Sequence, residues 1–364
     1  MIKVVMVIDT LTGGGKERRL VELLKGLSTS NETITYALII LSDIVSYKEV
    51  YELPGEVHTI QRNSSRDLSV FKKLYKICRV FDPDIIQAWE SMAAMYSMPV
   101  SKFLGAKFIN SSISHAPEYI KPFSKMWMRA RFTFPFSSAI IANSKAGLDS
   151  YKAPYYKSYC FYNGFDYNRI SELKDVQEVR NTLKITTKYV VGMVAEFSGK
   201  KDYATYIKAA QLILKNRNDV SFICVGKGAT LEKMKALVKD ENQERIIFVN
   251  WTDDVESVIN SFDIGVLATY TEGVSNAIME YMVMGLPVVA TDGGGTKEIL
   301  LDQKTGYLVE RSNISDLADK IESLLSNEQL AHEMGKAGKE RIRQEFNLEK
   351  MTESYIELYK KLSS

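Results

Sequence analysis

Cysteine and histidine are scarce in this chain of 364 residues, which contains three of each. Cys78, Cys160 and Cys224 lie far apart and are odd in number, a pattern that matches neither a disulfide framework nor a zinc cluster. We therefore expect three reduced, buried thiols and no metal site built on cysteine.

Long apolar runs are also missing. No stretch is long enough to cross a bilayer as a helix, and the apolar residues 1–9 are too few for a signal peptide with its cleavage site. No segment is of low complexity, and apolar and charged residues make up 45% and 25% of the chain, as in soluble globular proteins. These features predict a cytoplasmic protein.

Neither sign of charge is in large excess, since the net charge is only +2, but the charges are unevenly distributed. Residues 1–165 carry 21 basic and 14 acidic side chains, a net of +7, and the rest of the chain carries a net of −5. No nucleic-acid-binding motif accompanies the basic half, so we expect no nucleic-acid partner.

The segment of residues 120–132 mixes basic and aromatic side chains and allows two interpretations. Such a stretch can rest on an anionic membrane and receive a lipid-linked acceptor. It can equally be an amphipathic helix whose methionine and aromatic face is core. The positive charge of the first half favours the membrane, which adds peripheral contact with the inner face of the cell membrane to the expected location.

Strand-like runs alternate with helical patterns along the chain. Strands are predicted at residues 3–8, 35–41, 85–87 and 108–109, and helices at residues 17–27, 68–81 and 348–362. The same alternation begins again after a polar stretch, with a new first strand at residues 189–194. This alternation of strands and helices predicts parallel sheets covered by helices. The chain is also longer than a typical single domain with one hydrophobic core. We therefore expect an α/β protein with two open parallel-sheet domains and a cleft between them.

The most informative stretch is residues 271–280, Thr-Glu-Gly-Val-Ser-Asn-Ala-Ile-Met-Glu. Ser275 or Asn276 is a good N-cap for a short helix, and a buried strand is predicted just before the motif. The motif then lies at the carboxyl end of a strand, where open α/β sheets bind ligands, and the helix N-terminus favours a diphosphate. Glu272 would face that anion, and Glu280 would lie about two turns further on.

A glycine-rich turn, residues 12–18, follows the first predicted strand and opens a helix. Glycines let the backbone approach a phosphate or a sugar closely. A dinucleotide-binding turn is an alternative, but Glu17 and Arg18 occupy the place of that pattern's third glycine.

These motifs resemble those of the retaining family 4 glycosyltransferases. Glu272 and Glu280 reproduce the family's Glu-x7-Glu motif, and residues 285–298 resemble its continuation. Gly14 and Gly15 resemble its first-loop motif, and the Asn-Gly-Phe-Asp of residues 163–166 resembles its signature at the end of the first domain.

The resemblance implies the GT-B fold, with two Rossmann-like domains facing a cleft. Residues 1–167 would form the acceptor-side domain, and residues 168–346 would form the domain that binds the nucleotide sugar. Residues 347–364 would form a helix that crosses back to the first domain.

The resemblance also implies roles for individual residues. Glu280 would hold ribose hydroxyls, Glu272 would hold sugar hydroxyls, and Lys201 would contact the diphosphate. His115 would face the transferred sugar, where family members carry a histidine, although a lone histidine is more often structural. The other substrate contacts are expected from Gly14, Gly15, Gly226, Trp251, Gly273, Val274, Ser275 and Asn276. The catalytic set is then Glu272, Lys201 and His115, with no metal.

The loop after the predicted strand at residues 189–194 departs from the family pattern. Family members present an arginine and then a lysine to the donor diphosphate, and here Lys201 fills the second place while Glu196 occupies the first. A carboxylate about 4 Å from a phosphate charge would cost on the order of 4 kcal/mol at an effective dielectric near 20. Glu196 is therefore expected to pair with a neighbouring lysine, Lys200 or Lys201. It would otherwise point away while another cation acts, namely Lys16, Arg18 or Lys227. A loop that binds no phosphate is the alternative.

The resemblance implies a retaining glycosyltransferase that moves a sugar from a nucleoside diphosphate to a hydroxyl of a glycan or lipid-linked acceptor. No cofactor is expected, and UDP is preferred to GDP as the donor nucleotide. A catalytically silent homologue that binds a sugar or a partner protein is an alternative, which Glu196 favours. A sugar-nucleotide epimerase of the same fold is a further alternative and would convert the donor without an acceptor.

Overall fold

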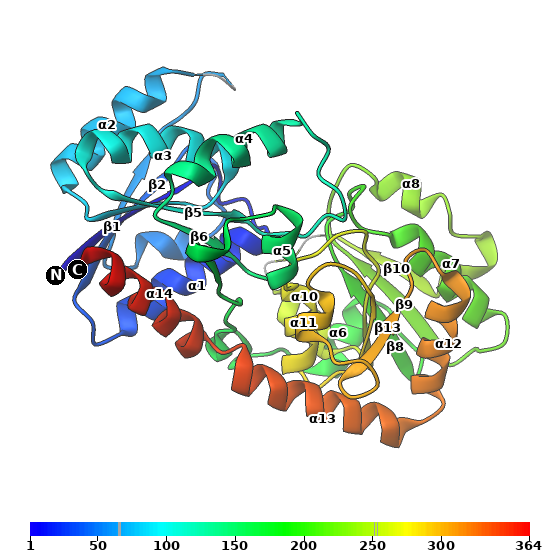
Figure 1. Ribbon diagram of the computed structural model, residues 1–364. Helices are drawn as coiled ribbons and strands as arrows, with labels where there is room; N and C mark the ends of the chain where they lie inside the picture. Colours follow the sequence, from blue (N-terminus) through cyan, green and yellow to red (C-terminus); the bar gives the residue numbers. More distant parts are fainter. Residues whose placement is uncertain (65–66, 251, 253) are drawn as a thin grey trace. The chain divides into compact units, whose positions relative to one another are not determined.

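The chain divides into two compact units in the computed structural model, which describes residues 1–64, 67–250, 252 and 254–364 (Figure 1). Unit 1 comprises Met1–Gly164 and Asn347–Ser364, and unit 2 comprises Phe165–Phe346. Each unit contains one parallel sheet covered by helices, so the predicted α/β class is confirmed.

Unit 1 contains a seven-stranded parallel sheet of order β3-β2-β1-β4-β5-β6-β7. Its strands are β1 (Ile2–Ile8), β2 (Ile34–Ile40), β3 (Glu56–Thr59), β4 (Ile85–Ala88), β5 (Lys107–Ile113), β6 (Ala139–Ala142) and β7 (Ser158–Cys160). Its helices are α1 (Gly15–Thr29), α2 (Ser69–Phe81), α3 (Ser91–Leu104), α4 (Lys125–Thr133), α5 (Lys145–Ser150) and α14 (Leu348–Ser363). In Figure 1, α2, α3 and α4 cover one face of the sheet, and α1 and α14 cover the other.

The first strand shows why its sequence is a continuous apolar run. Val4 and Met6 of β1 pack in the core cluster that includes α1 and α14, whereas Val5 and Val7 pack in the cluster that includes α2 and α3. A strand buried on both faces has no solvent-facing positions and needs no polar alternation.

The last helix, α14, contributes to the core of unit 1. Tyr355 and Tyr359 of α14 are fully buried in the same cluster as Trp89. The buried Arg19 of α1 donates a hydrogen bond of 2.6 Å to the Tyr355 hydroxyl, and its guanidinium lies 5.4 Å from the centre of the Trp89 ring. Residues near both ends of the chain therefore stabilise one core.

Unit 2 contains a six-stranded parallel sheet of order β10-β9-β8-β11-β12-β13. Its strands are β8 (Tyr189–Val194), β9 (Val220–Val225), β10 (Ile246–Val249), β11 (Ile264–Leu267), β12 (Val288–Thr291) and β13 (Gly306–Val309). Its helices are α6 (Val176–Thr182), α7 (Tyr203–Leu214), α8 (Leu231–Lys235), α9 (Val255–Asn260), α10 (Asn276–Val283), α11 (Thr296–Ile299), α12 (Ile314–Leu325) and α13 (Glu328–Glu345). The order of the strands reverses between β8 and β11, which is where such sheets bind ligands.

The sequence predicts three buried cysteines. Cys78 and Cys224 are buried, as predicted, but Cys160 is only partly buried, and none of the three forms a disulfide bond. Within the described part of the chain, no helix combines the length and the apolar character needed to traverse a bilayer.

Candidate active site

Two loops of unit 2 meet where β8 and β11 end. One loop connects β8 to α7 and the other connects β11 to α10. The Asp202 N–H donates to the Ala268 carbonyl at 2.9 Å, and the Tyr270 N–H donates to the Lys200 carbonyl at 3.0 Å. These backbone hydrogen bonds fix the two loops against each other at the switch point of the sheet.

The side chains that these loops bring together are Lys201 and Glu272, which form an ion pair. Their side chains are 19% and 13% exposed. The Thr269 hydroxyl donates to the Lys200 carbonyl at 3.0 Å, and the Glu272 carbonyl accepts the Gly295 N–H at 3.0 Å. The backbone beside Lys201 and the backbone of Glu272 are therefore held by contacts from other loops, and the two side chains also attract each other.

The surroundings of Lys201 lower its affinity for a proton. Burial lowers the pKa of the Lys201 ammonium to about 8, with Lys200 acting in the same direction and Glu196 in the opposite one. A partly dehydrated ammonium at this place interacts strongly with any anion that reaches it.

The helix α10 begins at Asn276, shortly after Glu272, as predicted. Ser275 is the N-cap residue, with φ −83° and ψ 128°, and its side chain makes no capping hydrogen bond. The first turn of α10 carries no acidic side chain, so its own residues do not neutralise the positive end of the helix dipole. Val274 and Ser275 are 3% and 6% exposed, and Gly285 ends the helix with a φ of 80°.

Glu280 lies inside α10, and Arg169 binds its carboxylate. Arg169 Nη2 lies 2.6 Å from Glu280 Oε1 and 2.5 Å from Glu256 Oε1. Sequence reasoning missed both Arg169 and Glu256. The one available signal was the position of Arg169, three residues after the Asn-Gly-Phe-Asp motif.

Glu196, which replaces the cation of the family pattern, does not pair with Lys201. The Glu196 side chain is exposed, and Lys201 pairs with Glu272 instead. One of the alternatives expected for Glu196, a pair with Lys201, is therefore wrong, because Lys201 pairs with Glu272. The loop of Glu196 is joined to the next loop by the Phe197 N–H, which donates to the Lys227 carbonyl at 3.0 Å.

Gly226 is required by this contact between loops. It has a φ of 151°, and a Cβ added to it would lie 2.0 Å from the Ala195 carbonyl oxygen. The glycine therefore lets two backbone segments approach each other, in addition to any contact it makes with a substrate.

We expect Gly226→Ala to lower the free energy of unfolding by about 2 kcal/mol or more, because the new methyl group forces the two loops apart. Gly199→Ala is the matched control, since a Cβ there meets nothing within 4 Å. Urea unfolding followed by circular dichroism measures both variants. Equal stability of Gly226→Ala and the wild type would contradict this role for Gly226.

The other glycine turn lies in unit 1. Gly14 is the N-cap residue of α1 and Gly15 is its first residue, so the helix begins two residues before the predicted start. Lys16 pairs with Glu90, whose Oε2 accepts the Asp9 N–H at 2.8 Å. The turn is therefore tied to the segment that follows β4.

His115 lies in unit 1, just after β5, where it is partly buried. Its ring packs edge-on against Tyr151, with ring centres 6.1 Å apart. Trp251, one of the predicted substrate contacts, lies outside the described residues. Among the residues that the structure describes, no group of three or more His, Cys, Asp or Glu side chains is placed to hold a metal ion.

Two family models match the chain over most of its length. The model "Glycosyltransferase Family 4" matches residues 13–169, and the model "Glycosyl transferases group 1" matches residues 175–341. The chain belongs to the family 4 glycosyltransferases. The first match includes most of the glycine turn of unit 1, and the second includes Lys201, Glu272 and Glu280.

Two curated relatives of this family 4 chain are bacterial glycosyltransferases by name. The poly(ribitol-phosphate) alpha-N-acetylglucosaminyltransferase of Staphylococcus aureus is 31% identical over 200 residues, which are 54% of this chain and 41% of that protein. The N-acetylgalactosamine-N,N'-diacetylbacillosaminyl-diphospho-undecaprenol 4-alpha-N-acetylgalactosaminyltransferase of Campylobacter jejuni is 23% identical over 352 residues, covering 91% of this chain and 92% of that protein. The chain spans only about half, or less, of the length of the first curated relatives that it matches.

Solved structures confirm the predicted GT-B fold. HepE of Anabaena, in complex with UDP and glucose, gives a TM-score of 0.85 over 99% of this chain and 100% of that chain, at 20% identity. TarM of Staphylococcus aureus, in a complex that includes UDP, gives a TM-score of 0.78 over 99% of this chain and 100% of that chain, at 14% identity. At these identities, the likeness establishes the fold alone.

Proposed function

We propose that this protein transfers a sugar, with retention of configuration, from a nucleoside diphosphate to a hydroxyl group in polysaccharide or lipid-linked glycan synthesis. The observation that carries the proposal is the Lys201–Glu272 ion pair at the switch point of the unit 2 sheet, directly before the start of α10. Family membership and the names of the curated relatives support the reaction class. Two solved neighbours that contain UDP support UDP as the donor nucleotide.

In this proposal, unit 2 holds the donor. Lys201 and the N-terminal amides of α10 contact the diphosphate, Glu272 contacts hydroxyls of the sugar, and Glu280 contacts the ribose. The backbone of residues 273–276 contributes further contacts to the sugar and phosphates, and Gly226 lies on the nucleotide side. From unit 1, Gly14 and Gly15 approach the phosphates and His115 faces the sugar.

The reaction exchanges one bond at the anomeric carbon for another. The bond between that carbon and the β-phosphate oxygen breaks, and a bond to the acceptor oxygen forms on the same face of the sugar. The acceptor proton passes to the departing phosphate, so no protein nucleophile is needed. The ammonium of Lys201 and the dipole of α10 stabilise the charge that develops on the leaving diphosphate, and we assign this task to them rather than to a metal ion.

A thermal-shift screen against UDP, GDP and ADP sugars tests the proposal, because a ligand that binds the folded state raises its stability. We expect one nucleotide family to raise the melting temperature and its sugar to be transferred to an added glycan acceptor. Conversion of the donor without an acceptor would indicate an epimerase. Failure of every nucleotide to bind would contradict the proposal.

The pKa of Lys201 makes donor affinity depend on pH. The ammonium is charged below about pH 8, and a bound diphosphate holds its proton more firmly, so affinity should fall about tenfold between pH 7 and pH 9. The terminal phosphate of UDP, the ligand to be titrated, is already largely ionised in this range, since the second ionisation of a phosphate group lies near pH 6.

Calorimetric titration of UDP across this pH range measures the effect. Lys200→Ala provides the control, because loss of a neighbouring positive charge raises the pKa of Lys201 and should shift the decline to higher pH. A UDP affinity that is constant from pH 7 to pH 9 would contradict the assignment of Lys201 to the diphosphate.

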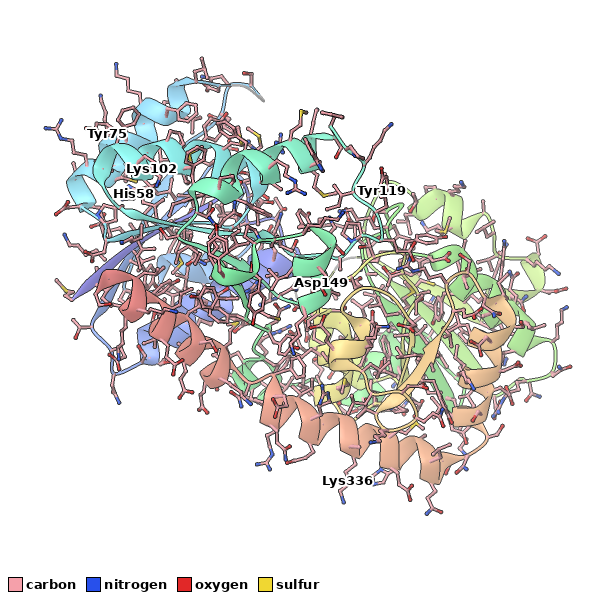
Figure 2. All side chains as sticks on the ribbon, in the orientation of Figure 1. His58, Tyr75, Lys102, Tyr119, Asp149 and Lys336 are labelled. Atoms are coloured by element: carbon pink, nitrogen blue, oxygen red, sulfur yellow. The ribbon has the colours of Figure 1, made fainter. Side chains whose placement is uncertain are left out.

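The exposed side of α4 supports a membrane contact in unit 1. We define the basic aromatic surface as Tyr119, Lys121, Phe123, Lys125, Met128, Arg131, Phe132 and Phe136, with Tyr119 on the loop that leads into α4 (Figure 2). Its aromatic side chains are markedly exposed, and Phe123 and Phe132 are 76% and 52% accessible. Met126 and Ala130 of the same helix pack inward, so one face of this segment is part of the core and the other is exposed.

We propose that the basic aromatic surface rests on an anionic membrane, where a lipid-linked acceptor would be found. Residues 119–157 contain seven basic and only one acidic side chain, which complements anionic headgroups. Exposed aromatic rings beside basic groups suit the boundary between headgroups and acyl chains.

We expect Phe123→Ser/Phe132→Ser to reduce binding to phosphatidylglycerol vesicles about tenfold, through loss of apolar area that enters the bilayer. Cosedimentation at two salt concentrations measures this binding, which should weaken at high salt. Phe103→Ser is the control, since Phe103 is 84% exposed on α3 and lies outside the basic aromatic surface. A wild-type protein that does not bind these vesicles would contradict the proposal.

A further inference from the structure

A buried arginine ties Glu280 to the helix beside it. Arg169 lies in the short 3-10 helix η4 (Tyr167–Ile170). Its Nη2 bridges Glu280 Oε1 at 2.6 Å and Glu256 Oε1 at 2.5 Å, and its Nε lies 2.8 Å from the same Glu256 oxygen. The three side chains are at most 10% exposed. One guanidinium therefore fixes carboxylates from α9 and α10.

The position of Arg169 is set by its surroundings as well as by these carboxylates. Its guanidinium carbon lies 4.7 Å from the centre of the Phe165 ring. Its N–H donates to the Asp166 carbonyl at 3.1 Å, and the Asp166 side chain caps η4 through the Asn168 N–H at 3.0 Å. The arginine can therefore act as a fixed support for Glu280.

The guanidinium of Arg169 lies between two buried carboxylates. A buried carboxylate without a cation is strongly disfavoured. Arg169 compensates that cost and holds Glu280 through Oε1. A carboxylate held in this way accepts hydrogen bonds from hydroxyl groups in one defined direction.

We propose that Arg169 is a positioning residue for recognition of the nucleotide ribose, through Glu280. The inference rests on the proposed function, which assigns Glu280 to the ribose. It adds that discrimination between a ribonucleotide and a nucleotide without 2′ and 3′ hydroxyls depends on Arg169, although Arg169 itself touches no part of the ligand.

The test compares the calorimetric affinities of the full-length protein for UDP and for 2′,3′-dideoxy-UDP. We expect Arg169→Gln to weaken UDP binding about tenfold, the cost of one charge-assisted hydrogen bond, and to leave the affinity for dideoxy-UDP unchanged. Arg169→Lys should restore part of the UDP affinity. A purely structural role for Arg169 would weaken both ligands equally.

A second variant keeps the test valid if Arg169→Gln does not fold. Arg169→Gln/Glu256→Gln removes one charge of each sign and so preserves the balance of the buried cluster. This double variant should lose about tenfold in affinity for UDP, as Arg169→Gln does, and should keep its affinity for dideoxy-UDP. Glu256→Gln is the matched single variant, in which Arg169 still holds Glu280, and it should retain the preference for UDP.

The outcomes separate the inference from the function on which it rests. A wild-type protein that binds neither UDP, GDP nor ADP, or that binds UDP and dideoxy-UDP equally, would contradict the ribose assignment and the inference together. A wild-type preference for UDP that is lost in Glu280→Gln but kept in Arg169→Gln/Glu256→Gln would overturn the inference alone.

Discussion

We expect Lys201→Ala to lower kcat for sugar transfer by about 100- to 1,000-fold, the usual cost of removing one group that stabilises developing charge. Negative charge grows on the diphosphate as the bond to the anomeric carbon breaks, and Lys201 supplies a partly dehydrated cation at that place. The measurement is the initial rate of nucleotide release in the presence of acceptor, together with the calorimetric affinity for UDP, which should also fall.

The neighbouring Lys200→Ala is the matched control. The Lys200 side chain is exposed, and its backbone carbonyl, which holds Thr269 and Tyr270, is unchanged by the substitution. We expect kcat within about threefold of the wild type, as for an exposed charge that is screened by solvent. Similar losses in the two variants would show that positive charge in the loop, rather than Lys201, is what matters.

Glu272→Gln should have the second largest effect, lowering kcat/KM for the donor sugar about 100-fold. The carboxylate would hold hydroxyls of the sugar, and hydrogen bonds to a charged group are worth about 1.5–3 kcal/mol each. Glutamine has the same shape, so the loss reports charge rather than packing.

The affinity of Glu272→Gln for UDP, which has no sugar, should be equal to or higher than that of the wild type. The Glu272 carboxylate competes with the diphosphate for Lys201, and the substitution removes that competition. A tenfold loss of UDP affinity in Glu272→Gln would contradict the division of roles between the two side chains.

Much of the fold follows from patterns that are local in the sequence. The apolar run of β1 and the restart at β8 were predictable, because strands buried on both faces leave continuous hydrophobic stretches. The short strands β6 and β7, with four and three residues, were not predictable, because so few residues show no recognisable hydrophobic periodicity. The start of α1 was placed two residues late, because Gly15 is a poor helix former that the turn nevertheless requires.

In the candidate site, too, the local features were predictable and the contacts between distant residues were not. Glu272, Glu280 and the start of α10 come from one continuous motif, and their local structure was predicted. The pairs made by Lys201 and Arg169 join residues that are 71, 87 and 111 positions apart, and only the topology of the sheet brings them together. Glu196 illustrates the limit, since its mismatch with the family was visible in the sequence but the partner of Lys201 was not.

A crystal structure of the protein with a bound nucleoside diphosphate tests the central claim most directly. The account predicts the β-phosphate within hydrogen-bonding distance of Lys201 Nζ and the first amides of α10, with the ribose hydroxyls on the Glu280 carboxylate. A nucleotide bound with its diphosphate away from Lys201, while the Lys201–Glu272 ion pair remains intact, would contradict it.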